Sequence, residues 1–395
     1  MNSNALTTEE SNSEPDTVGS PLHARPRLVP LSDSAVPLWR REPRLVEILA
    51  IVAMVAILFV TAVSHFGSYS HILRESGDNG AYISAASAIR HWDFRGVQVK
   101  QFWGYSYVMA LVSLTGLSLS ACLLFVSIAC SLLSTLICFR LWGGWIAALF
   151  AISNFEWMQR SFLGGSEPLF VLFLFACFWA VRAQRWKTAA LLASLATITR
   201  PVGFMALLAI GIVLLWNREY RKMISSMAMS GAIGMLYLLP FWLYFGDPLY
   251  QVHRYRTSDW HSGSAVSWPL HAIIQSLIRN REPWTNVVLT MTWIIFAIVA
   301  LVALTLQRRR WMQEAKAEWL FALIYGSFLL CYSSPEWARA DFPRFIIPAL
   351  PIMFVAVSDW FPRDRRLLWV IATVSPLLAA ASALGIRNVL AALRT

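Results

Sequence analysis

Long apolar runs recur along the chain, and short polar turns separate them. A spanning helix needs about 20 apolar residues, and a helix satisfies its own backbone hydrogen bonds inside lipid. The pattern therefore predicts an all-α, polytopic transmembrane bundle. Two further apolar regions, 141–157 and 188–217, are interrupted, the second by Arg200-Pro201. The clear candidate spans are residues 45–66, 119–139, 162–181, 223–245, 287–306, 319–332, 345–360 and 367–384.

Lys and Arg are concentrated in the N-terminal tail and in the brief turns between apolar runs. Such clusters mark the cytoplasmic side of a membrane protein, so an even number of crossings must separate each cluster from the next. Residues 188–217 then hold two short helices or a re-entrant hairpin. The count is about eleven crossings, with the N-terminus inside and the C-terminus outside. The basic clusters lie at 25–44, 140, 182–187, 218–222, 308–316 and 363–366.

Composition supports a membrane protein. The chain is 57% apolar and 14% charged, with a mean hydropathy of +0.54, whereas soluble domains are about 45–50% apolar and about 25% charged. The net charge of +11 belongs to the turn clusters, so nucleic acid is not an expected partner. Residues 1–44 predict a disordered cytoplasmic tail before one transmembrane domain, 45–395. The five cysteines form no pair in an external loop, and disulfides are not expected.

Several catalytic motifs are missing from the sequence. It has no P-loop, HExxH, GxSxG, CxxC or GxGxxG pattern, which removes the usual support for ATP-driven transport, zinc proteolysis and Rossmann redox chemistry. The external histidines show no ligand spacing, so no cofactor is expected and a divalent metal has no sequence support. Nearly all the polar residues that are not topology signals fall in external loops at 67–118, 246–286, 153–167, 199–203 and 333–344.

The first external loop contains a short amphipathic segment. Tyr82, Ala85, Ala86 and Ile89 recur at helical spacing with polar residues opposite them, which predicts a helix lying in the membrane interface. Asp78 stands just before this helix. An Asp fills the N-cap position well, and a carboxylate held at the membrane surface is also a candidate general base. One side chain can serve both roles.

Two charged residues lie beside the interrupted regions. Glu167 stands between Ser166 and Pro168, which suit the start of a helix, and the helix dipole favours an acid there. Glu167 therefore has a structural interpretation and a substrate-binding one. Arg200 precedes Pro201, so a helix should end at this point. The arginine either stabilises that helix end or has a functional role, because charge at membrane depth is costly.

Two later external segments are also candidates. Residues 246–261 interleave aromatic side chains with cations and amides, His253 among them. This pattern fits contacts to sugar rings and phosphates, or an aromatic belt at the interface. Arg344 opens an apolar run, where it can reach lipid headgroups or bind an anionic lipid group.

Five of these motifs resemble the GT-C class of integral-membrane glycosyltransferases. They are an Asp in the first external loop, GGSEPLF at 164–170, LATITRP at 195–201, GDPLYQVHRY at 246–255 and RFIIPALP at 344–351. The fourth, followed by Trp260, looks like the PIG-V mannosyltransferase branch. The resemblance covers most of 45–360. The family often pairs acidic residues in the first loop, whereas here Asn79 follows Asp78, so Asp93 is an alternative base.

The resemblance implies a GT-C-like fold and an inverting glycosyltransferase. It would transfer a sugar, with mannose expected, from a polyprenyl-phosphate donor to an acceptor hydroxyl on the extracytoplasmic side of a bacterial inner membrane or an endoplasmic reticulum. Its partners would be membrane lipids, that donor and an unidentified acceptor. Asp78 would act as the base, and Arg200 and Arg344 would bind the lipid phosphate. The sugar or acceptor would contact Glu167, Trp157, His253 and Tyr82.

Two other function classes stay open on sequence grounds. A secondary transporter or lipid flippase usually has internal repeats with matching broken helices, and the sequence shows no such symmetry. A non-catalytic membrane subunit would stabilise partners without chemistry of its own. Loss of catalysis on a conservative change of Asp78 would distinguish an enzyme from such a scaffold.

Overall fold

The computed structural model describes residues 41–383, apart from positions 67, 77, 95–96, 98–100, 257–265, 280–283 and 333–340. Within these residues the chain is helical, and its β contact is the isolated bridge Val266–Tyr332. This part confirms the all-α prediction. The predicted tail falls outside the described residues except for positions 41–44. The helices are α1 (Leu45–Phe66), α2 (Tyr69–Glu75), α3 (Asn79–His91), α4 (Gly104–Ser113), α5 (Leu119–Trp142), α6 (Gly144–Ile152), α7 (Phe155–Leu163), α8 (Glu167–Arg182), α9 (Trp186–Thr199), η2 (Pro201–Gly203), α10 (Phe204–Trp216), α11 (Tyr220–Phe245), α12 (Tyr250–Arg256), α13 (His271–Arg279), α14 (Trp284–Leu306), α15 (Arg308–Glu314), α16 (Lys316–Cys331), α18 (Phe342–Phe345), η4 (Ile347–Ala349), α19 (Leu350–Val357), η5 (Ser358–Trp360) and α20 (Arg365–Ala383).

Several described helices are long and apolar enough to cross a membrane. On α11, the large side chains of Met235, Leu236 and Leu243 are at least 65% exposed. A continuous exposed apolar face of this kind marks contact with lipid or with another apolar surface. These helices indicate a membrane protein. If α7 and α8 are taken together as one bent span, they make a sixth candidate. The five segments of the described residues that meet the length and hydropathy of a span by themselves are Leu45–His65, Leu119–Trp142, Tyr220–Phe245, Val287–Leu306 and Phe342–Trp360.

Most predicted apolar runs coincide with observed helices. The first helix has the predicted limits, and α11 and α14 end where expected. The run predicted over 162–181 differs at its start, because α7 ends at Leu163, α8 begins at Glu167 and their axes meet at 110°. Gly164 permits this bend, since its φ of +91° lies in the left-handed region that costs glycine little.

The second interrupted region forms two short helices, one of the two arrangements predicted for it. α9 ends at Thr199, and Arg200 has an extended backbone (φ −145°, ψ 130°), as the residue before a proline prefers. η2 then leads into α10. A Cβ at Gly203 would lie 2.6 Å from backbone atoms of Ala196 and Thr197, so this turn packs directly on α9. The result is a helical hairpin whose tip carries Arg200.

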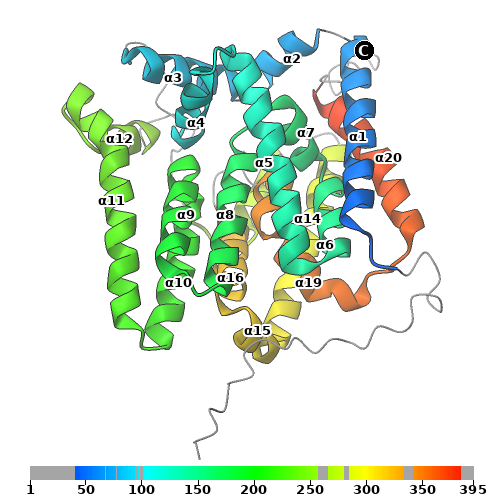
Figure 1. Ribbon diagram of the computed structural model, residues 1–395. Helices are drawn as coiled ribbons and strands as arrows, with labels where there is room; N and C mark the ends of the chain where they lie inside the picture. The colour runs from blue at the N-terminus through cyan, green and yellow to red at the C-terminus, as the bar shows by residue number, and fades with distance from the viewer. Residues whose placement is uncertain are drawn as a thin grey trace, which may run out of the picture.

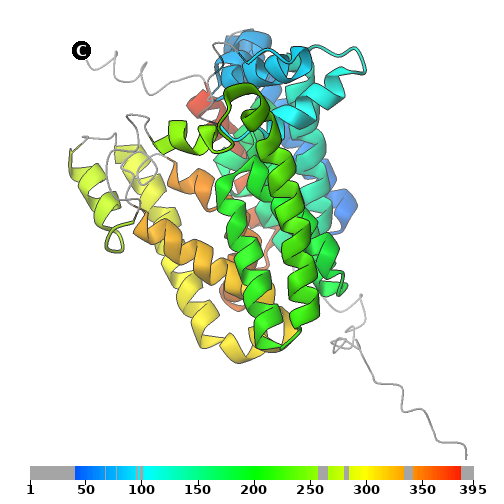
Figure 2. The ribbon, with the colours of Figure 1, turned by 90° about the vertical axis from the view of Figure 1, so that its left-hand side faces the viewer.

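The two ends of the bundle differ. At one end, α3 and α4 lie across the other helices (Figure 1), and α3 buries Tyr82 and Ala86 against α4 and α5. This confirms the amphipathic helix predicted for the first loop. At the opposite end lie α15 and the turn between α10 and α11, which carry Arg308–Arg310 and Arg218 (Figure 1, Figure 2). The candidate polar residues are therefore near the first end and these basic turns near the second.

Candidate functional site

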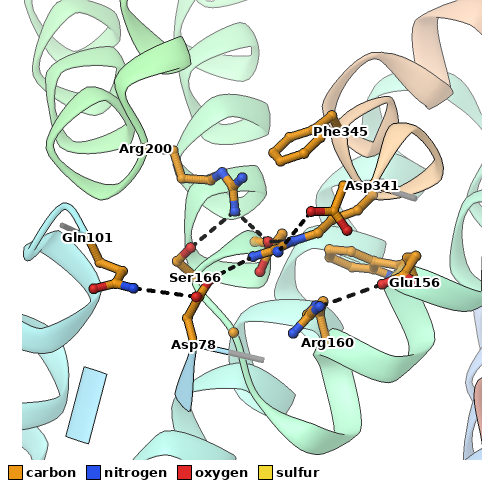
Figure 3. A network of polar contacts seen from close by, with 12 residues as sticks. Asp78, Gln101, Glu156, Arg160, Ser166, Arg200, Asp341 and Phe345 are labelled. Carbon is orange, nitrogen blue, oxygen red and sulfur yellow. Dashed lines mark hydrogen bonds and ion pairs between the residues drawn. The ribbon is translucent and has the colours of Figure 1, made fainter. Parts of the chain in front are cut away.

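Five charged side chains from separate parts of the chain meet below α3. We call Asp78, Glu167, Arg200, Asp341 and Arg344 the carboxylate–arginine cluster (Figure 3). Asp78 precedes α3, Glu167 begins α8, Arg200 follows α9, and the other two lie at the start of α18. The structure thus brings together four of the seven residues predicted from the sequence to bind or catalyse, which are Asp78, Glu167, Arg200 and Arg344. Arg344 lies between Asp78 and Glu167.

Glu167 is the centre of the cluster. It is 3% exposed, and its Oε1 accepts hydrogen bonds from Arg200 Nη1 and Arg344 Nε. A buried carboxylate is stable only with such partners, because desolvation of an unpaired charge is costly. The other oxygen, Oε2, has no hydrogen-bond partner among the described residues. Glu167 therefore fixes two guanidinium groups beside each other, and its Oε2 can still accept a hydrogen bond.

Asp78 is the most accessible of the three carboxylates in the cluster. Its side chain is 40% exposed, with Oδ2 3.4 Å from Arg344 Nη2 and Oδ1 3.4 Å from Gln101 Nε2. It occupies the N-cap position of α3, as predicted, but its side chain makes no capping hydrogen bond. Both contacts are long for hydrogen bonds. The carboxylate is thus aimed into the cluster rather than at the helix backbone, and it is loosely held there.

Arg200 and Arg344 both contact the ring of Phe345 as well as the carboxylate of Glu167. Their guanidinium carbons lie 5.1 Å and 5.7 Å from the ring centre of Phe345, within cation–π range. Arg344 Nη1 is also 3.9 Å from Asp341, whose side chain is 38% exposed. When all groups are ionised, three carboxylates face two guanidinium groups. The contacts of Arg344 with Asp78 and Asp341 are long and partly exposed, so an incoming anion could replace them without disturbing Glu167.

Tyr82 supports the cluster from α3. Its hydroxyl donates to Ser166 Oγ at 2.9 Å, and Ser166 Oγ also accepts from Arg200 Nη1 at 3.3 Å. Ser166, expected to cap α8, makes no capping bond and serves this network instead. Burial, with the nearby carboxylate of Asp78 as a second cause, raises the pKa of Tyr82 to about 12. Tyr82 is therefore a neutral hydrogen-bond donor at ordinary pH.

Asn79, which stands where the resembled family often has a second acid, has a structural role. Its Nδ2 donates to the carbonyl oxygens of Leu73 and Leu163, each at 2.6 Å, and the residue is fully buried. These bonds join α2, the start of α3 and the end of α7. A carboxylate cannot donate a hydrogen bond when ionised, so an acid at this position would face two carbonyl oxygens.

Two glutamines position the Asp78 side of the cluster: Gln251 of the 246–255 motif, and Gln101, which sequence reasoning missed. Gln251 Nε2 donates to the carbonyl of Gln101 at 2.5 Å, and Tyr237 donates to Gln251 Oε1 at 2.5 Å. Gln101 in turn contacts Asp78. Gln251 belongs to the 246–255 motif, but it is 2% exposed and braces a loop. Nothing in the sequence marks Gln101, which lies in an irregular segment without periodicity.

The chain matches no protein-family model, no curated protein and no solved structure. The resemblance to GT-C enzymes therefore stays a prediction from the motifs. In the part of the chain that the structure describes, no group of three or more His, Cys, Asp or Glu side chains is placed to hold a metal ion. All five cysteines are free thiols.

Three predicted residues lie elsewhere. Trp157 of α7 is 2% exposed and packs against Phe150, with ring centres 4.6 Å apart, in the main hydrophobic core. His253 of α12 is largely exposed, and its Nδ1 lies 2.9 Å from Asp247. Asp93, the alternative base, follows α3 and accepts from Tyr244 at 3.4 Å. None of the three is a member of the carboxylate–arginine cluster, and their predicted roles are not tested by this geometry.

Proposed function

We propose that this protein is an integral-membrane, inverting glycosyltransferase that uses a polyprenyl-phosphate sugar as donor. The observation that carries the proposal is the placement of Asp78, a partly exposed carboxylate, beside two guanidinium groups that Glu167 holds together. Transfer from a lipid phosphate needs a base for the acceptor hydroxyl and fixed positive charge for the departing phosphate. The cluster offers both.

In the proposed reaction, Asp78 accepts the proton of an acceptor hydroxyl. The freed oxygen forms a bond to the anomeric carbon from the face opposite the lipid phosphate, and the carbon–oxygen bond to that phosphate breaks. The electron pair leaves on the phosphate oxygen, where Arg200 and Arg344 would stabilise the added negative charge. Preorganised donors act strongly at such a position because they need no reorganisation during the reaction.

Phosphate binding and base release are coupled in this scheme. Arg344 Nη2 lies 3.4 Å from Asp78 Oδ2. A phosphate that takes over this guanidinium nitrogen would leave Asp78 free to approach the acceptor. Glu167 keeps both arginines in position throughout, because its bonds to them are buried.

The proposal includes a multi-pass topology with about eleven crossings and the cluster on the extracytoplasmic side. Its support is the separation of the cluster from the basic turns at α15 and between α10 and α11 (Figure 1). Single cysteines introduced at Arg185 and Arg309 test this topology. They should react with a membrane-impermeant thiol reagent only after the membrane is opened, and external labelling of either position in intact spheroplasts would contradict the scheme.

The activity itself can be tested with the purified full-length protein in liposomes. Polyprenyl phosphomannose is supplied with a membrane glycolipid extract as the source of acceptor. The expected result is release of polyprenyl phosphate together with a new glycosylated product, followed by mass spectrometry. Movement of the intact donor lipid between leaflets without any cleavage would favour a flippase, and neither cleavage nor movement would favour a non-catalytic subunit.

A further inference from the structure

A second polar surface adjoins the cluster and is not used by the mechanism above. It is the face of α7 formed by Glu156, Gln159 and Arg160, which stand at positions i, i+3 and i+4 and so share one side of the helix. These side chains are 8% exposed or less. Polar and charged groups so deeply buried normally have hydrogen-bond partners.

On the α7 face, each of the three side chains has a polar atom that lacks a hydrogen-bond partner within the described part of the chain. Glu156 Oε2, Gln159 Oε1 and Arg160 Nε have no hydrogen-bond partner among the described residues. Arg160 Nη2 is 3.7 Å from Glu156 Oε2, which is an ion pair but too long for a hydrogen bond. Leaving buried polar atoms unsatisfied costs stability. Such atoms need an explanation in a folded protein, and three of them on one helix face beside the cluster are explained by a ligand that supplies the missing partners.

The α7 face is held rigidly against the cluster. Asn154 caps α7 by accepting from Trp157 N at 3.0 Å, and it donates to the Pro343 carbonyl at 2.7 Å beside Arg344. At the other end of α7, a Cβ on Gly165 would lie 2.6 Å from Glu167 Oε2 and 2.9 Å from Arg160 Cδ. A glycine is needed there, and the polar face therefore directly adjoins Glu167.

The atoms without a hydrogen-bond partner in the part of the chain that the structure describes indicate the chemical class of the ligand. Three of them are acceptors, Glu156 Oε2, Gln159 Oε1 and Glu167 Oε2, and one is a donor, Arg160 Nε. A phosphate offers acceptors alone, so it would meet these oxygens with repulsion. A sugar carries hydroxyl groups, each of which donates and also accepts. The α7 face thus matches a polyhydroxyl ligand rather than the phosphate.

We infer that the α7 face binds hydroxyl groups of the donor sugar, an inference that rests on the proposed function. Figure 3 places Glu156 and Arg160 on one side of the cluster and Asp78 with Gln101 on the other. The sugar would then lie over Glu167, with its phosphate at the two arginines and its anomeric carbon toward Asp78. Glu156 and Gln159 would determine which sugar is accepted.

Binding of paired probes to the full-length protein in nanodiscs tests this inference. Citronellyl phosphate carries the lipid phosphate alone, and its mannose, glucose and N-acetylglucosamine esters add one sugar each. The wild-type protein should bind one ester at least about tenfold more tightly than citronellyl phosphate, the effect of hydrogen bonds to charged groups. Gln159→Leu and Glu156→Gln should remove most of that gain and leave the affinity for citronellyl phosphate within about twofold.

Gln307→Leu is the matched control. Gln307 also has a buried Oε1 without a partner among the described residues, but it lies beside α15 at the opposite end. This variant should keep the full sugar gain, and thermal unfolding without ligand shows whether each variant is folded. If wild type binds neither kind of probe, the proposed function fails. If wild type binds both kinds but gains nothing from any sugar, or if the folded Gln159→Leu and Glu156→Gln variants keep the gain, the function stands and the α7 inference fails.

Discussion

Asp78 and Arg344 are 266 positions apart in the sequence, and the structure places Arg344 Nη2 3.4 Å from Asp78 Oδ2. The same guanidinium group donates through Nε to Glu167. Arg344 therefore connects the accessible carboxylate to the buried one. A planar guanidinium group with donors in fixed directions can do this, whereas a lysine ammonium is a single point of charge.

Arg344→Lys should accordingly impair transfer although it keeps the charge. The expected loss in kcat is about 10²–10³-fold, the effect of removing one positioned donor from a developing anion. Steady-state release of polyprenyl phosphate measures it. Arg182→Lys is the control, because Arg182 bonds Glu318 at 2.7 Å near the other end of α8. That variant should lose stability but keep its rate, and equal losses of rate in the two variants would contradict the role of Arg344.

Glu167→Gln should strongly destabilise the protein. The substitution leaves the buried guanidinium groups of Arg200 and Arg344 without the carboxylate that compensates them, and breaking a buried pair in this way costs about 3–5 kcal/mol. Reversible unfolding in mixed detergent micelles measures the change. The double variant Glu167→Gln with Arg200→Gln should cost less than the sum of the two single changes. Additive losses would show that the pair is not coupled.

Asn79→Asp should destabilise the protein by roughly 1–3 kcal/mol for each of the two carbonyl oxygens that lose their donor. The same unfolding measurement applies. Asn217→Asp is a matched control, since Asn217 is exposed and accepts from Lys316 at 3.2 Å. That change should be neutral or slightly stabilising. An Asn79→Asp variant as stable as wild type would mean that the first loop tolerates the acidic pair common in the resembled family.

Much of the fold follows from the sequence pattern. Apolar runs of full length define α1 and α14 closely, because lipid-length helices leave a strong hydropathy signal. The break at Arg200-Pro201 was predictable from the steric restriction before proline. The bend at Gly164 was not predicted, since the apolar run continues through it and the turn depends on one positive φ.

The site was predictable to a lesser degree. The place of Asp78 before an amphipathic helix and the charges of Glu167, Arg200 and Arg344 beside apolar runs marked these four residues in the sequence, and the structure brings them together. A neutral residue that makes a tertiary contact has no comparable signal in the sequence. Gln101 reaches Asp78 through loop geometry alone, so sequence reasoning missed it.

The raised pKa of Tyr82 predicts a specific dependence of stability on pH. Burial raises the folded-state pKa to about 12, against about 10 in the unfolded chain. The contribution of Tyr82 is therefore complete below pH 10 and is lost as the pH rises toward 12, by about 1.4 kcal/mol per pH unit. The advantage of wild type over Tyr82→Phe in unfolding free energy should be constant below pH 10 and shrink above it. A constant difference up to pH 12 would contradict the burial of an un-ionised hydroxyl.

Asp78 is the base in the proposed reaction. Asp78→Asn keeps the shape of the side chain and removes its charge. Because Asp78 makes no capping bond and two long, partly exposed contacts, unfolding free energy should change by less than about 1 kcal/mol. Asp93→Asn provides the control, since Asp93 lies beyond α3 and contacts Tyr244.

The most direct measurement is the rate of sugar transfer by Asp78→Asn in liposomes, compared with wild type and Asp93→Asn at matched protein content. We predict a loss of about 10²–10⁴-fold for Asp78→Asn, the usual contribution of a positioned base, and a rate near wild type for Asp93→Asn. A folded Asp78→Asn protein that transfers sugar at the wild-type rate would contradict the account.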